Sequence, residues 1–148
     1  MKKIFLPISV AVLVGFTTLT GCKKEGCTDG IAKNFDSKAK KDDGSCSYEA
    51  SVQFWFDAAT SLDMSLDDIS TLTVYIGDEE LGTYLVDDFS DSTPSCGASG
   101  IISKTFQLGS SKSKKVSFEI VDDNDEVVDS GDLVIEASAK CNNYQIEY

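Results

Sequence analysis

The chain has 148 residues, and its 25 acidic residues outnumber its 13 lysines, which gives a formal net charge of −12. It contains no histidine, so serine–histidine and cysteine–histidine catalysis are excluded and the commonest metal ligand is missing. It also contains no arginine, the usual bidentate ligand of phosphate, and so acidic a chain repels nucleic acid. We therefore expect no nucleic-acid partner.

The first 21 residues have the pattern of an export signal. Lys2 and Lys3 give a basic start, an apolar run extends from Ile4 to Val14, and a less apolar run from Gly15 leads to Thr20. This order is typical of a secretory signal peptide. The apolar run is shorter than the roughly 20 residues that a membrane-spanning helix needs.

The signal ends in the residues Leu19, Thr20, Gly21 and Cys22. Here the chain resembles the bacterial lipoproteins that are cut by the lipoprotein-specific signal peptidase, whose lipobox is an aliphatic residue, a small residue, Gly or Ala, and then Cys. The resemblance implies removal of residues 1–21 and a diacylglycerol on Cys22, usually with an N-acyl chain, and two or more chains anchor a protein stably. The alternative is an ordinary secretory signal with Cys22 free or in a disulfide.

Cleavage at this position would leave 11 lysines against 25 acidic residues, a net charge of −14. Residues 22–26 would form a lipidated tether. Lys23 follows Cys22 where inner-membrane retention would favour Asp, so we expect the outer membrane, on its periplasmic face or at the cell surface. The membrane, reached through the lipid, is thus the first expected partner.

Four cysteines remain once Cys22 is assigned to lipid. One pair, Cys27 and Cys46, lies close together near the N-terminus, and the other, Cys96 and Cys141, lies in the C-terminal part. We predict the disulfides Cys27–Cys46 and Cys96–Cys141, which an oxidising compartment permits. Free cysteines or a four-thiol zinc site are the alternatives, although the chain has no CxxC pair.

Residues 27–48 form a disulfide-stapled acidic module with too few apolar residues to fold without the staple. The stretch resembles a short module of secreted and cell-envelope proteins of the Bacteroidetes group. The matching residues are Cys27, Thr28, Asp29, Ala32, Asn34, Phe35, Ala39, Asp42, Asp43, Gly44, Ser45, Cys46 and Tyr48. The resemblance implies no role for the module.

Oxygen ligands gather in this module. Asp36, Asp42 and Asp43 are carboxylates in a constrained loop, and carboxylates are the ligands that calcium prefers. A tentative calcium site is one interpretation, and calcium is the one cofactor that the sequence suggests. The other interpretation, which we prefer, is a solvated turn.

Residues 50–148 alternate between apolar and polar side chains with period two, interrupted by turn residues. The expected strands centre on residues 52–56, 71–76, 81–86, 102–108, 116–121, 127–128, 133–135 and 144–148. We interpret 58–69 as a turn or loop because it is rich in Asp and Ser, 122–126 as a solvated acidic turn, and 129–132 as a turn. Lys112, Lys114 and Lys115 read as a solubilising loop.

Seven or eight short antiparallel strands over about 100 residues predict an all-β fold, a β-sandwich of the immunoglobulin-like or transthyretin-like kind. The domain also resembles a small β domain of Bacteroidetes envelope proteins, on residues 52–55, 72–76, 93–100, Phe106, 130–135 and Cys141. That resemblance implies a fold and a lineage, but no activity.

Three functions are compatible with these features. We favour a non-enzymatic envelope lipoprotein, with no catalytic residues, whose sandwich is structural or binds a ligand or an envelope protein. The alternative is a carbohydrate-binding accessory lipoprotein, with Trp55, Tyr75 and Tyr84 as an aromatic platform for a glycan. The interpretation that we prefer for Trp55 is that it fills the sandwich core or the junction with the disulfide-stapled module, and burial of all three aromatic residues would exclude the platform. A glycosidase would need two carboxylates facing each other across a cleft.

Overall fold

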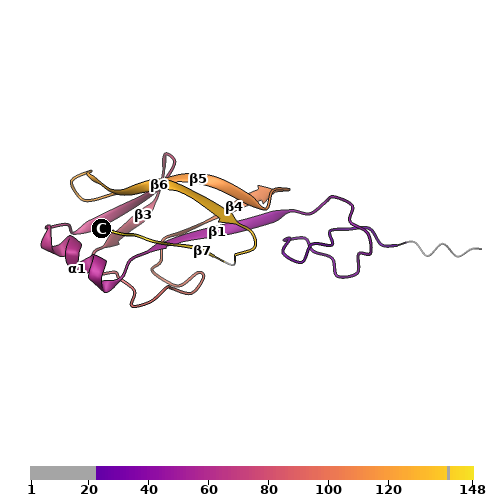
Figure 1. The fold of residues 1–148 in the computed structure, drawn as a ribbon, viewed down its shortest axis with the longest axis horizontal. Coiled ribbons are helices and arrows are strands. Elements are labelled where there is room, and N and C mark those ends of the chain that lie inside the picture. Colours follow the sequence, from indigo (N-terminus) through magenta and orange to yellow (C-terminus); the bar gives the residue numbers. More distant parts are fainter. Residues whose placement is uncertain (1–22, 140) are drawn as a thin grey trace, which may run out of the picture.

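The computed structural model describes residues 23–139 and 141–148, which form an elongated molecule with a small module at one end and a helix at the other (Figure 1). The elements are β1 (Tyr48–Trp55), α1 (Ala58–Leu66), β2 (Thr71–Ile76), β3 (Glu79–Leu85), β4 (Ser103–Gly109), β5 (Ser113–Val121), β6 (Val127–Glu136) and β7 (Asn142–Gln145). Within these residues, no helix has the length and apolar character to cross a bilayer.

The strands form two sheets, and the expected all-β sandwich is confirmed. One sheet has the order β4-β1-β7 and the other the order β3-β2-β5-β6. All neighbouring strands run antiparallel except β1 and β7, which are parallel and pair Val52 with Asn142 and Trp55 with Gln145. This parallel pair departs from the purely antiparallel expectation. After β6, in the other sheet, the chain crosses to β1 and then runs beside it, as β7, in the same direction.

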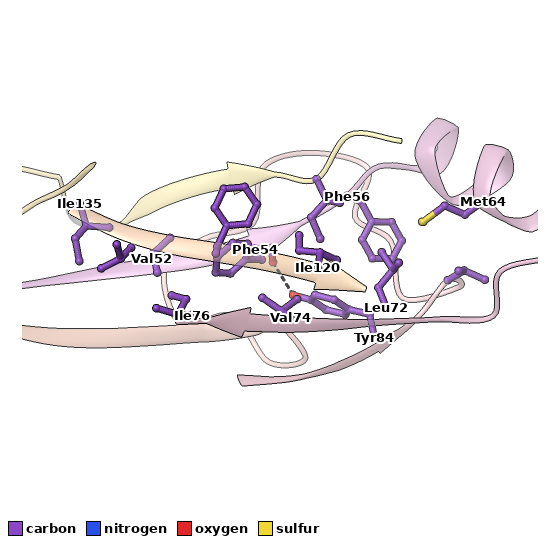
Figure 2. Packing of buried hydrophobic residues seen from close by; sticks show 14 of the residues in the cluster. Val52, Phe54, Phe56, Met64, Leu72, Val74, Ile76, Tyr84, Ile120 and Ile135 are labelled. Atoms are coloured by element: carbon purple, nitrogen blue, oxygen red, sulfur yellow. Dashed lines mark hydrogen bonds between the residues drawn. The ribbon is translucent and has the colours of Figure 1, made fainter. Parts of the chain in front are cut away.

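The core lies between the two sheets and follows the predicted alternation. Every second residue of β2 is buried, and β5 buries its inward residues in the same way. Figure 2 shows these side chains meeting residues of β1 and Met64 of α1. The rings of Phe54, Phe118 and Tyr144 pack together with centroids 4.5–5.9 Å apart. Burial of this apolar area, at roughly 25 cal/mol per Å², drives the two sheets together.

One buried hydroxyl joins the sheets. Tyr84 of β3 is 2% exposed, and its hydroxyl donates a hydrogen bond to the Phe54 carbonyl at 2.5 Å (Figure 2). The same oxygen accepts a hydrogen bond from the Ile102 N–H at 2.7 Å. Burial raises the pKa of Tyr84 to about 12. Tyr84 therefore satisfies two main-chain groups while its ring packs edge-on against Phe56.

The outer side of β1 is also buried, although it faces away from the other sheet. Gln53 is 1% exposed, and its amide donates hydrogen bonds to the Pro94 carbonyl and to Asn143 Oδ1. Pro94 belongs to the loop between β3 and β4, which the disulfide Cys96–Cys141 fastens to the start of β7. Both predicted disulfides are present, since Cys27 is bonded to Cys46. The second one fixes the loop against the outer side of β1.

The expectation of a loop over residues 58–69 is wrong, because most of that segment is helix α1. Asp57 caps the helix, with its Oδ1 accepting the Thr60 N–H at 2.9 Å. At the other end Asp68 has φ 59°, and the Ile69 N–H bonds to the Met64 carbonyl. This is a Schellman-type ending with an aspartate in the left-handed position. Some of the acidic residues that argued against a helix therefore end it, since Asp67 is its C-cap and Asp68 takes the left-handed position.

The expected turn at residues 129–132 is also wrong, because β6 runs unbroken from Val127 to Glu136. Asp129 and Gly131 occupy inward positions and interrupt the apolar alternation. Asp129 is inward because its carboxylate accepts the Tyr144 hydroxyl at 2.7 Å. The inward position 131 is occupied by glycine, because a Cβ there would lie only 3.3 Å from the Phe118 ring. Each exception to the pattern therefore has a packing reason.

Candidate functional site

Cys22 lies outside the described residues, so the structure begins just after the expected lipid attachment. The segment that follows is held by main-chain bonds. The Gly26 N–H donates to the Lys41 carbonyl at 3.1 Å, and the Lys40 N–H donates to the Lys24 carbonyl at 2.8 Å. Glu25 also forms an ion pair with Lys41 at 2.5 Å. The expected tether is therefore fixed to the module from Lys24 onward.

The acidic side chains of the module cap its turns. Asp36 accepts the Lys38 N–H at 2.9 Å and pairs with Lys24 at 2.5 Å. Asp42 accepts the Gly44 N–H at 2.7 Å, and Asp43 accepts the Ser45 N–H at 2.9 Å. These bonds lower the pKa of Asp36, led by Lys24, and that of Asp43, led by Ser45. Such side-chain caps stabilise turns that have no ladder partners.

The tentative calcium site at Asp36, Asp42 and Asp43 is not formed. The three carboxylates accept N–H groups of three different residues, Lys38, Gly44 and Ser45, and in residues 23–139 and 141–148 no three potential ligands gather as a metal site. The name acidic module also needs correction. Four aspartates of residues 27–48 are balanced by Lys33, Lys38, Lys40 and Lys41. Charge in this module is therefore neutral overall.

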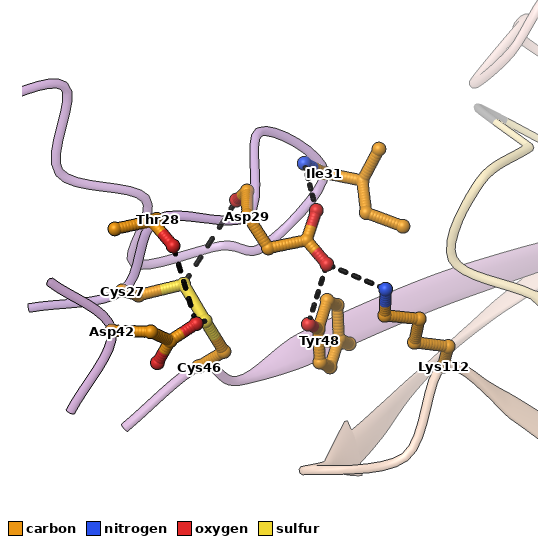
Figure 3. A network of polar contacts seen from close by, with 8 residues as sticks. All are labelled: Cys27, Thr28, Asp29, Ile31, Asp42, Cys46, Tyr48 and Lys112. Atoms are coloured by element: carbon orange, nitrogen blue, oxygen red, sulfur yellow. Dashed lines mark hydrogen bonds and ion pairs between the residues drawn. A yellow bond between two sulfur atoms is a disulfide. The ribbon is translucent and has the colours of Figure 1, made fainter. Parts of the chain in front are cut away.

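The module is joined to the sandwich through Asp29. Figure 3 shows its Oδ2 accepting the Tyr48 hydroxyl at 2.8 Å and facing the Lys112 ammonium at 2.7 Å. Its Oδ1 accepts the Ile31 N–H at 3.2 Å. Lys112, and then Tyr48 and Ile31, hold the pKa of Asp29 at about 2, and the bond to Asp29 raises the pKa of Tyr48. Asp29 is therefore ionised at any physiological pH.

Further contacts surround this junction. Lys33 of the module and Gln107 of β4 both bond to Glu49, at 2.7 and 3.1 Å. A small apolar cluster of Cys27, Ala32 and Tyr48 packs against Leu108 and Ala137 of the sandwich. Lys112 also lies over the Tyr48 ring, 5.6 Å from its centroid. Module and sandwich are therefore connected by packing, ion pairs and the chain itself.

Lys112 was not recognised in the sequence, where the lysines before and within β5 read as a solubilising loop. Its partner Asp29 is far away in the chain, so no local pattern pairs them. Lys115 likewise forms an ion pair with Asp132 of β6 at 2.8 Å. A useful signal existed, because these are among the few lysines in a strongly acidic domain.

The structure does not assemble the aromatic platform expected from Trp55, Tyr75 and Tyr84. Trp55 is 7% exposed and Tyr84 is 2% exposed, so neither ring face is free to stack on a sugar. Trp55 lies on β1 in one sheet, whereas Tyr75 and Tyr84 lie on β2 and β3 in the other. Tyr75 is half-buried. That interpretation of the three residues is therefore wrong.

The end of the sandwich opposite the module, here called the distal end, is built from several segments. Strand register brings together α1, the 85–91 segment, the 122–126 turn and residues 146–148 (Figure 1). An open hollow of about 340 Å³ lies there, lined by residues 87–90 and 99–101. The Asp122 carboxylate caps the 122–126 turn by accepting the N–H groups of Asn124 and Glu126, both at 2.8 Å.

The pKa shifts of the carboxyl groups indicate which roles these groups can take. Those of Asp29, Asp36, Asp43, Glu49, Asp57, Asp122 and Asp132 are all lowered, chiefly by lysines or backbone N–H groups. A general acid needs the opposite shift, toward neutral pH. These carboxylates are suited to capping turns and to pairing with lysines.

Comparison with known proteins gives little. No family model and no solved structure matches the chain. A segment of 24 residues is 71% identical to the chloroplastic ribulose bisphosphate carboxylase/oxygenase activase of Oryza sativa subsp. japonica. That segment spans 16% of this chain and 5% of the activase, so the likeness concerns one short stretch and assigns the chain to no family.

Proposed function

We propose that this protein is a lipid-anchored protein of the bacterial outer membrane, facing the periplasm or the cell surface. Its β-sandwich is a non-catalytic structural or binding domain. The support for the anchor is the coincidence of a basic start, an apolar run and the Leu19–Cys22 box. The paired cysteines support an oxidising compartment, since disulfides persist there and are rare in the cytosol.

The observation that carries the proposal is the unbroken series of contacts from Lys24 to the sandwich. Lys24 and Gly26 bond to residues 40–41, a disulfide closes the module, and Asp29 holds Lys112. A lipid on Cys22 would therefore be attached to a stiff support rather than to a flexible linker. The support sets the direction in which the sandwich points from the membrane and places α1 at the far end (Figure 1).

The non-catalytic part of the proposal rests on how the polar groups are used. Asp57 caps a helix, Asp122 caps a turn, and Asp129 accepts the Tyr144 hydroxyl. The buried hydroxyl of Tyr84 is bonded to two main-chain groups. These groups support the fold, and an active site would instead orient some of them toward a cleft.

The intact mass of the membrane-extracted protein, measured before and after reduction, tests the proposal. We expect loss of residues 1–21, an added mass of diacylglycerol and an acyl chain, and a gain of four hydrogen atoms when the two disulfides are reduced. Tandem mass spectrometry should locate the lipid on Cys22. The Cys22→Ala variant is the control, and it should retain its signal peptide and carry no lipid.

A lipid-free mass from a chain cut elsewhere would contradict the anchor. A gain of fewer than four hydrogen atoms would contradict the pairing of the four other cysteines. The lipid-free outcome would leave the fold untouched, whereas missing hydrogen atoms would bear on the disulfides of the fold and not on the anchor, so the two parts of the measurement are separate tests. Protease treatment of whole cells would then assign the protein to the periplasmic face or to the cell surface.

A further inference from the structure

Helix α1 is apolar on two sides. Its inner side buries Met64 and Ser61 against the sandwich. Its outer side carries Ala58, Leu62 and Leu66, spaced four residues apart and therefore aligned along the helix. Leu62 is 60% exposed and Leu66 is 72% exposed. Adjoining exposed apolar side chains of this kind can form the contact surface of an interaction site, whereas singly scattered ones need no such explanation.

Tyr148 lies at the C-terminal end of this helix, and we call Ala58, Leu62, Leu66 and Tyr148 together the outer face of α1. Its hydroxyl donates a hydrogen bond to Asp67 Oδ2 at 2.8 Å, and Asp63 also lies near enough to raise the pKa of Tyr148. The ring remains 48% exposed. Apolar side chains and carboxylates therefore alternate across one small area at the distal end.

The negative charge of this end is not neutralised by the chain itself. The sequence has no lysine between Lys41 and Lys104, or between Lys115 and Lys140. The ion pairs among the described residues use carboxylates at 25, 29, 36, 49, 79 and 132, none of which belongs to a distal segment. Asp63, Asp67 and Asp68 border the leucines without an ion-pair partner in that part of the chain.

We propose that the outer face of α1 binds a basic amphipathic segment of another protein, whose apolar side chains pack on Leu62 and Leu66 while its cations face Asp63 and Asp67. Charge complementarity selects this occupant, because opposite potentials attract and like charges repel across an interface. A second copy would bring an equally acidic distal end, and an anionic membrane would repel it. The inference rests on the proposed function, which directs this end away from the anchor.

Titration calorimetry on residues 22–148, carrying Cys22→Ser and therefore free of lipid, tests the inference. Three synthetic helical peptides of about 18 residues, or five turns, serve as probes. The first has a row of leucines flanked by lysines, the second replaces the leucines with serine, and the third replaces the lysines with glutamate. We expect the first to bind at least about tenfold more tightly than the second, and the third not to bind.

Two pairs of variants locate the binding. Leu62→Gln with Leu66→Gln should weaken the first peptide about tenfold or more, and glutamine keeps the helix propensity of leucine. Val134→Thr, which changes an apolar residue 58% exposed near the other end of the sandwich, should leave binding unchanged. Asp63→Asn with Asp67→Asn should also weaken binding, whereas Asp78→Asn with Glu80→Gln in the β2–β3 hairpin should not.

Equal binding of the leucine–lysine and serine–lysine peptides would overturn the inference, because only charge would be recognised. Full binding by the Leu62→Gln, Leu66→Gln variant would overturn it as well. A dimer in sedimentation equilibrium that this variant dissociates would make a second copy the occupant. Because the tested protein carries no lipid, none of these results affects the anchoring proposal, which the intact mass decides separately.

Discussion

The Asp29 carboxylate lies 2.7 Å from the Lys112 ammonium group, and this pair joins the disulfide module to the turn that precedes β5. Tyr48, at the start of β1, donates its hydroxyl to the same carboxylate oxygen at 2.8 Å. One side chain therefore connects the support, the first strand and the opposite sheet. We therefore expect the orientation of the sandwich on its support to depend on this carboxylate being ionised.

The contribution of Asp29 to the free energy of unfolding should be lost at acid pH. The pKa of Asp29 is lowered to about 2, from about 3.9 in an unfolded chain. A lowered folded-state pKa means that the stabilisation is complete above about pH 4 and is lost as the pH falls through about 2. The difference in free energy of unfolding between wild type and Asp29→Asn, measured in urea, should shrink over that window. A difference that is the same at pH 5 and below pH 2 would contradict this assignment.

Replacement of Lys112 should loosen the module without unfolding the sandwich. Lys112→Met removes the cation that faces Asp29, while Lys114→Met removes an equal charge that lies over the Phe106 ring of the sandwich. Spin labels at Ser37 and Ser103 report the distance between the two parts. We expect a broader distance distribution for Lys112→Met than for Lys114→Met. Identical distributions would mean that packing alone fixes the orientation.

Loss of the first disulfide should unfold the module locally. The module buries little apolar surface of its own, so its staple, which closes a loop between residues 19 apart, contributes about 3 kcal/mol. Cys27→Ser with Cys46→Ser should expose the module lysines, such as Lys38 and Lys40, to trypsin while the sandwich survives as a large fragment. Cys96→Ser with Cys141→Ser is the control and should leave the module protected. Equal protection of the module in both variants would show that the contacts with the sandwich keep the module folded without its disulfide.

Alternation of side chains predicted most strands correctly, because one face of each strand is buried. The segments 71–76 and 116–121 of the prediction correspond to β2 and β5. The two cysteine pairs were also predicted correctly, since nearness in the chain suggested one pair and the other followed. These features depend on local pattern or on simple pairing, which the sequence displays directly.

What alternation could not place depends mostly on contact between distant residues, whereas helix α1 was missed through its local caps. Trp55 is buried, as the preferred core interpretation expected. Alternation alone did not show what covers that side of β1, which also holds Gln53, bonded to Pro94 in a loop held by Cys96. The burial of Trp55 therefore depends on a loop that alternation does not place. Lys112 was overlooked for the same reason, since Asp29 belongs to another part of the chain.

Substitution of Gly131 should be more costly than its place on an edge strand suggests. A Cβ at this position would lie 3.3 Å from Phe118 Cε1, and Phe118 packs on Tyr144 in the core. Gly131→Val should therefore destabilise the sandwich by about 1–3 kcal/mol through overpacking. Ser130→Val, on the outward face of the same strand, is the matched control and should be neutral or slightly stabilising. Guanidinium denaturation of both variants checks this, and equal midpoints would contradict the packing reason.

Removal of the Tyr84 hydroxyl should destabilise the sandwich by about 1–3 kcal/mol, because Tyr84→Phe leaves the buried Phe54 carbonyl and Ile102 N–H without this partner. Tyr75→Phe, at a half-buried position on β2, is the control and should cost less. The pKa of Tyr84 is raised to about 12 from a usual value of about 10, so its contribution is complete below about pH 10 and is lost as the pH rises toward 12. Urea unfolding of wild type and Tyr84→Phe across that range should therefore converge at high pH. A gap that stays constant would mean that ring packing, and not the hydroxyl, carries the effect.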